Sequence, residues 1–86
     1  MAAKTALAYE EVVDFIAEGP RPSKIIAFRP SAASKERVAD LIYREKTVGL
    51  TADERSELDH YLQLEHLMRL AKARARRYVA NEQLRQ

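Results

Sequence analysis

The chain has 86 residues, of which 47% are hydrophobic and 33% are charged, and it contains two Gly, three Pro and no Cys. This length allows one domain at most, and the composition is too apolar for a chain that stays unfolded. The absence of Cys excludes disulfides, thiolate metal sites and a Cys nucleophile. A chain this short buries only about 60–65% of the surface that it exposes when unfolded, so a partner chain would add to its thin core.

The N-terminal residues contain no apolar run long enough for a signal peptide or a membrane-spanning helix, because Tyr9, Glu10 and Glu11 follow the first eight residues at once. We therefore expect a cytoplasmic protein that does not bind membranes as an integral component. We also expect residues 1–86 to form a single helical domain.

Residues 7–17 alternate apolar and acidic side chains with the period of a short amphipathic helix, which Gly19 and Pro20 would end. Residues 21–30 lie between prolines and fit either an extended strand or a helical turn begun by Pro22. We favour the turn, or an irregular apolar tether, because no second strand candidate is available for pairing. Three apolar side chains of this segment are expected to pack into the core: Ile25, Ile26 and Phe28.

A second helix is predicted from a cap at Ser31 or Ser34 to about Thr47, since apolar side chains recur there at helical spacing. Gly49 can adopt the left-handed conformation that closes such a helix, and Leu50 supplies the apolar contact beyond it. The sequence therefore predicts a sharp corner after this helix.

The last helix is predicted to begin with a capping box, in which Thr51 and Glu54 exchange side-chain and backbone hydrogen bonds. No Gly or Pro follows Thr51, so this amphipathic helix is expected over residues 52–80, with a basic C-terminal half. The fold class expected is all-α: a helical hairpin with a long C-terminal helix and a short N-terminal helix packed on it.

The long helix is expected to carry more apolar surface than so short a chain can cover. The helix before it is about half as long, so the distal half is expected to need a second chain, either another copy or a different protein. Leu62, Leu67 and Leu70 widen the apolar stripe near the middle of the helix. The residues expected to bind the partner share one helical face: Tyr61, Leu64, Met68, Ala71, Ala75 and Tyr78.

Charge changes sign along this helix, from a net of −4 in residues 51–65 to a net of +5 in residues 66–86. The basic side chains that would contact a partner or a nucleic acid are Arg69, Lys72, Arg74, Arg76 and Arg77. Four interpretations remain open: a solvated helix end that complements the helix dipole, a helix that binds a partner protein, a phosphate-binding surface, and a membrane surface. A membrane surface fits the basic residues least well, because the apolar residues near them are mostly Ala.

Glu57 and His60 form a Glu-x-x-His pair, which is half of a di-iron carboxylate motif, but the other half is missing. We expect both side chains to face solvent. The chain also lacks a glycine-rich phosphate loop and a nucleophile with a matched acid or base. The sequence therefore predicts no enzyme, no cofactor, no metal site and no small-molecule substrate.

Several segments of the chain resemble a group of small bacterial helical proteins, similar to the helical partner proteins encoded beside small toxin or nuclease genes. The segments are Phe28-Arg29-Pro30-Ser31, residues 49–54, Glu57-Leu58, Tyr61, residues 64–67 and residues 71–76. The resemblance implies an antitoxin-like or accessory protein that binds another protein. The N-terminal part shows no ribbon or helix-turn-helix module of the kind found in DNA-binding antitoxins, which puts operator binding in doubt.

The sequence thus predicts a protein–protein interaction module that binds a partner chain through its long C-terminal helix. The partner expected is another copy of the chain, in a homo-oligomer, or a toxin- or nuclease-like protein. The alternative is a nucleic-acid-binding protein that uses the arginine-rich part of the same helix.

Overall fold

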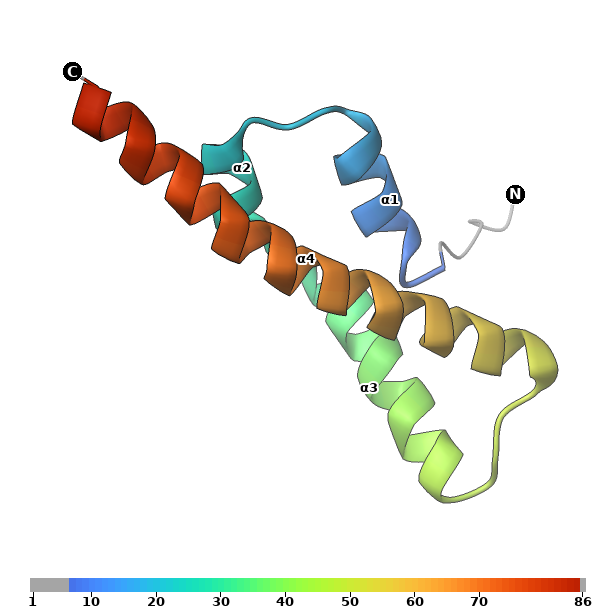
Figure 1. Ribbon diagram of the computed structural model, residues 1–86. Coiled ribbons are helices and arrows are strands. Elements are labelled where there is room, and N and C mark those ends of the chain that lie inside the picture. Colours follow the sequence, from blue (N-terminus) through green and yellow to red (C-terminus); the bar gives the residue numbers. More distant parts are fainter. Residues whose placement is uncertain (1–6, 86) are drawn as a thin grey trace.

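The computed structural model describes residues 7–85, which form four helices and no strand (Figure 1). The helices are α1 (Glu10–Ala17), α2 (Pro22–Ala27), α3 (Ala32–Lys46) and α4 (Ala52–Arg85). The molecule is elongated, with extents of 55 × 32 × 18 Å, because the 34 residues of α4 alone span about 51 Å. The predicted all-α class is confirmed for this part of the chain.

The corner between α3 and α4 has the local chemistry that the sequence predicts. The Ser31 hydroxyl accepts a hydrogen bond from the Ser34 amide at the start of α3. At its end, Gly49 has a φ of +89° and donates its amide to the Arg44 carbonyl. The Thr51 hydroxyl and the Glu54 carboxylate then accept from each other's backbone amides, at 3.1 and 3.0 Å, which completes the capping box.

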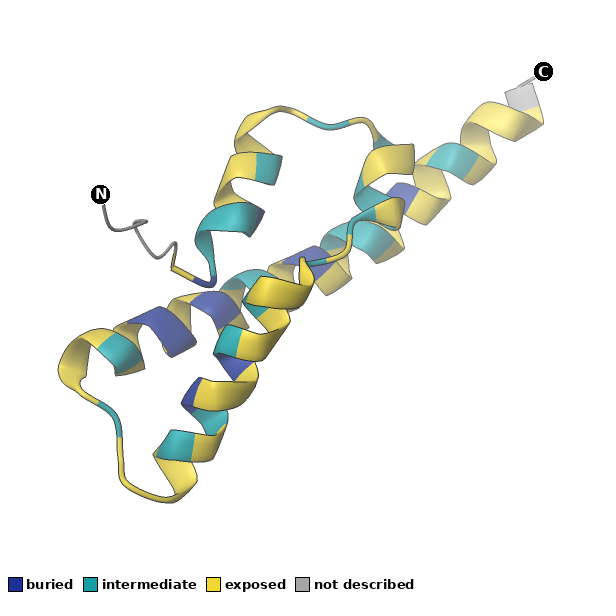
Figure 2. Ribbon diagram, turned by 180° about the vertical axis from the view of Figure 1, so that it is seen from behind, coloured by how far each residue is buried: buried dark blue, intermediate teal, exposed yellow. Residues whose placement is uncertain are grey.

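The small core lies where α3 crosses the first half of α4. Leu41 is fully buried there, and Val38, Leu58, Tyr61 and Ala8 surround it. Figure 2 shows buried segments of α3 and α4 where these two helices cross. Farther toward the corner, ion pairs of Arg44 with Glu54 and of Arg55 with Glu45 link the two helices. A tight hairpin along their full length stays a prediction.

The segment between the prolines adopts the predicted helical turn, with Pro22 at the first position of α2, where its missing amide costs no hydrogen bond. The side chains Ile25, Ile26 and Phe28 are half-buried, not enclosed, so the expectation of a core plug holds only in part. The Phe28 ring packs against Phe15 of α1, with 4.4 Å between ring centroids. This segment is therefore a thin cover with one side open to solvent.

α2 lies along the C-terminal half of α4, and this pair has the most extensive contact between any two helices of the described chain (Figure 1). Lys72 of α4 stabilises this packing, because its ammonium group donates a hydrogen bond to the Phe28 carbonyl at 2.7 Å, across 44 residues of sequence. Ala75 is 3% exposed, since a small side chain allows α2 to approach. The sequence placed a second chain at the small residues Ala71 and Ala75, but α2 of the same chain lies there, while Tyr78 and Leu84 farther along α4 remain exposed.

The packing of α2 on α4 is tested by Ala75→Asp, compared with Ala73→Asp, which makes the same change at an exposed position two residues away. We expect Ala75→Asp to lower the free energy of unfolding by about 2 kcal/mol or more, because it buries a charge under α2. The control should cost no more than about 0.7 kcal/mol, the difference in helix propensity. Chemical denaturation measures both, and hydrogen exchange should show lost protection in residues 22–27 for the buried change only.

Candidate interaction surfaces

The face predicted to bind a partner, which we call the inner face, is turned mostly toward the protein's own helices. Of its residues, Tyr61, Met68 and Ala75 are buried, Leu64 and Ala71 are half-buried, and Tyr78 is 54% exposed. α1, α2 and α3 of the same chain cover the inner face as far as Ala75. A partner-binding role for this set stays a prediction that now depends on Tyr78.

The opposite side of α4, which we call the outer face, carries large apolar side chains in solvent. Leu62, Leu67 and Leu70 are 44–56% exposed. They alternate at helical spacing with four exposed polar residues of the same side: Asp59, His66, Arg74 and Arg77. α4 passes in front of α2 and α3 in Figure 1, and within residues 7–85 the side chains of the outer face are exposed.

Sequence reasoning missed the outer face because it treated these leucines as the edges of one broad stripe. The feature of the sequence that distinguishes the inner face from the outer face lies in the segment between the prolines. Ile25, Ile26 and Phe28 are half-buried in the segment that packs on one side of α4. Within residues 7–85, no second segment of this kind packs on the other side.

The basic side chains of α4 lie on several of its sides. Arg74, Arg76 and Arg77 are exposed, and Arg69 forms an exposed ion pair with Glu65 at 3.1 Å. Lys72 differs from the others because it is half-buried and bonded to the carbonyl of Phe28. Burial lowers the pKa of Lys72, and the nearby positive charges of Arg29 and Arg76 lower it further.

α2 and its flanks bring more positive charge to the same end of the molecule. Arg21, Lys24 and Arg29 are exposed, and no acidic residue occurs among residues 19–30. Together with residues 66–84 of α4, this segment forms what we call the basic lobe. The lobe has eight basic residues against one acidic residue, Glu82, for a net charge of +7. Residues 7–18 and 31–65, with twelve acidic and five basic residues, carry a net charge of −7.

The Glu-x-x-His pair is divided between the interior and the surface. His60 is exposed, as predicted, but Glu57 is 3% exposed, so the expectation that it faces solvent is wrong. Arg37 binds the Glu57 carboxylate with two hydrogen bonds of 2.8 and 3.1 Å, and the amide of Ala8 donates a third at 2.9 Å. These bonds tie α3, α4 and the start of the chain together, which is a structural role.

The pKa of Glu57 is held below its ordinary value. The hydrogen bonds from Arg37 are the largest cause, burial opposes them, and the amide of Ala8 adds to the lowering. Among residues 7–85, no group of three or more acidic or His side chains is placed to hold a metal ion.

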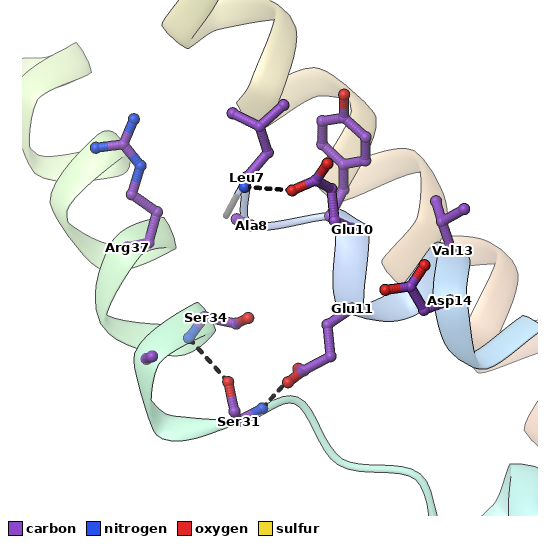
Figure 3. A pocket seen from close by; sticks show the side chains of 11 residues that line it. Leu7, Ala8, Glu10, Glu11, Val13, Asp14, Ser31, Ser34 and Arg37 are labelled. Carbon is purple, nitrogen blue, oxygen red and sulfur yellow. Dashed lines mark hydrogen bonds between the residues drawn. The ribbon is translucent and has the colours of Figure 1, made fainter. Parts of the chain in front are cut away.

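A hollow of about 660 Å³ lies between α1 and α3 (Figure 3). Two of its carboxylates accept hydrogen bonds from the backbone: Glu10 accepts from the Leu7 amide at 2.8 Å, and Glu11 accepts from the Ser31 amide at 2.7 Å. Arg37, on its rim, is paired with Glu57. These groups hold the entry to α1 and the start of α3 in place.

None of the helices within residues 7–85 is long and apolar enough to cross a membrane.

The buried ion pair leads to a prediction about stability and pH. Since folding lowers the pKa of Glu57, its contribution to stability is complete above the ordinary value of 4.5 and is lost as the pH falls through the lower, folded value. Glu57→Gln should lower the free energy of unfolding by about 1–3 kcal/mol at neutral pH and should weaken its dependence on acid.

Glu65→Gln is the matched control, because it removes the carboxylate of an exposed Arg pair on the same helix and should cost less than about 1 kcal/mol. Denaturant titrations at several pH values measure both variants. Equal losses in the two would contradict the structural role of Glu57. The pKa of Glu54 is also lowered, chiefly by the amide of Thr51. Part of the dependence of stability on acid pH should therefore remain in the Glu57→Gln variant.

Comparisons of the chain with protein-family models, with curated proteins and with solved structures found no match.

Proposed function

We propose that this protein is an interaction module that binds another protein chain through the outer face of α4. The observation that carries the proposal is the exposure of Leu62, Leu67 and Leu70 on one side of a helix whose other side the chain covers itself. Large apolar side chains that recur on a solvent-exposed side of a helix favour association, because burying them removes apolar surface from water.

The charge order of the outer face favours a second copy of this chain as the partner. Asp59 lies on the N-terminal side of the leucines, and Arg74 and Arg77 lie on the C-terminal side. An antiparallel pairing of two α4 helices about a two-fold axis near Leu67 places Asp59 of each copy opposite Arg77 of the other. Such an interface is closed and complementary to itself, which is the usual form of a homodimer.

The antitoxin-like or accessory role that the resemblance implies, with a toxin- or nuclease-like partner, also stays a proposal. It needs a protein-binding surface, and the outer face is the surface that we assign to it. The absence of enzymatic activity stays a prediction from the sequence. Nucleic-acid binding is a second candidate because of the basic lobe, and it is developed in the next subsection.

Self-association is tested by sedimentation equilibrium of the full chain. We expect a dimer whose dissociation constant rises when Leu62, Leu67 and Leu70 are changed together to Gln, because the apolar contact is lost. Val48→Gln is the control, since Val48 is also an exposed apolar residue but lies at the corner, away from the outer face. A protein that stays monomeric up to about 100 μM, some hundredfold above an ordinary micromolar dissociation constant, would contradict the proposal.

Charge reversal tests the antiparallel orientation. Asp59→Arg and Arg77→Asp should each weaken the dimer by about 2- to 30-fold, since each change disrupts two symmetry-related pairs worth about 0.2–1 kcal/mol apiece. The double variant should regain most of the lost affinity. Asp59 and Arg77 are about 27 Å apart along one helix, so recovery can come only from contacts between copies. Additive losses in the double variant would rule out this pairing.

A further inference from the structure

We propose that the basic lobe binds the phosphate backbone of a nucleic acid, with Arg29, Lys72 and Arg76 as its central contacts. The surface combines α2 and its flanks with the C-terminal half of α4, so it exists only after the chain has folded. This inference does not depend on the proposed function, because the three residues lie outside the outer face.

The centre of the surface is a pair of cations held at one carbonyl group. The Arg29 Nη1 and Lys72 Nζ atoms donate to the oxygen of Phe28 at 2.8 and 2.7 Å, so these two nitrogens lie at most 5.5 Å apart. Among the described residues, neither side chain forms an ion pair with a carboxylate, and Arg76 forms none either. Like charges this close repel each other, and one phosphate group between them would relieve the repulsion.

The structure around Lys72 shows that the three cations influence one another. The pKa of Lys72 is lowered by burial and then by the charges of Arg29 and Arg76. A bound phosphate would act in the opposite direction, since an anion stabilises the charged form of each cation. A phosphate bound at this point would therefore gain more binding energy than a phosphate bound at an isolated surface lysine.

The size of the lobe and its large excess of positive charge favour a polymer over a single small anion. Arg69, Lys72 and Arg76 follow each other along α4 at intervals of about 4.5 and 6 Å, and Arg21 and Lys24 extend the positive surface onto α2 and its N-terminal flank. The remainder of the described chain carries a net charge of −7 and would repel a polyanion. A nucleic acid would thus be directed to one end of the molecule.

An anionic membrane fits this surface less well. Membrane-surface helices combine their basic side chains with a large apolar face. Around the three central cations, the apolar side chains of α4 are instead turned inward, as for Met68 and Ala75, or kept small, as for Ala71 and Ala73. Because phosphate contacts carry no sequence information, we expect binding with little sequence preference.

The test is fluorescence anisotropy of a labelled short DNA duplex with the full chain, as a function of salt. If about three phosphates are contacted, the slope of log K against log salt is about −2.7, which is a loss of roughly 40-fold between about 50 and 200 mM salt. Arg29→Ala and Arg76→Ala should each reduce the steepness of the slope by about 1. Lys46→Ala is the control, because it removes an exposed positive charge at the opposite end of the molecule.

Arg29 also donates to the Ile26 carbonyl. Its variant is therefore compared with Arg76→Glu, which removes no hydrogen bond or ion pair among the described residues. Circular dichroism of each variant verifies that the helices remain. No binding to the duplex at about 50 mM salt, or equal effects of the lobe and control variants, would overturn the proposal. Equal binding to vesicles of anionic lipid or to poly-glutamate would also overturn it, in favour of a membrane or an acidic protein.

The changes of Leu62, Leu67 and Leu70 to Gln separate this proposal from self-association. They should leave the salt slope of duplex binding unchanged while they weaken the dimer. If these changes abolish duplex binding as well, the outer face, and not the basic lobe, is the surface responsible, and the inference fails.

Discussion

A helix of 34 residues needs cover along about 51 Å, and the 15 residues of α3 span less than half of that length. This constraint shapes the rest of the molecule. The N-terminal part of the chain lies along α4. As a result, α1 and α2 cover the part of α4 that α3 does not reach. At the distal end, the six residues of α2 cover the side of α4 around the small side chain of Ala75, and Tyr78 and Leu84 beyond it stay exposed.

Covering one side of α4 divides the helix into two surfaces with different chemistry. The inner face becomes the core, and the leucines that remain exposed on the outer face become the surface that we assign to a protein partner. The packing of α2 on α4 also brings basic side chains of the two segments together. α2 and its flanks carry Arg21, Lys24 and Arg29 and no acidic residue. The packing of this segment on α4 therefore joins two positive segments, and the hydrogen bond between Lys72 and the Phe28 carbonyl links them across 44 residues of sequence. The two proposed surfaces therefore follow from one packing arrangement.

The features that sequence reasoning predicted correctly are local ones. The capping box of Thr51 and Glu54, the left-handed Gly49 and the helical start at Pro22 each depend on neighbouring residues, so they can be read from the chain in order. The features that it missed are long-range. Burial of Glu57 depends on Arg37, twenty residues away, and on the amide of Ala8, forty-nine residues away. The cover over Ala75 likewise depends on where α2 lies, which helical periodicity does not specify.

The central claim is that α2 covers the inner face of α4 within one molecule. Nuclear Overhauser contacts between residues 22–28 and residues 68–79 test it most directly, recorded on a mixture of isotope-labelled and unlabelled protein that distinguishes contacts within a chain from contacts between chains. The account predicts that these contacts arise within single chains and persist on dilution. Contacts found only between chains, or none at all, would contradict it.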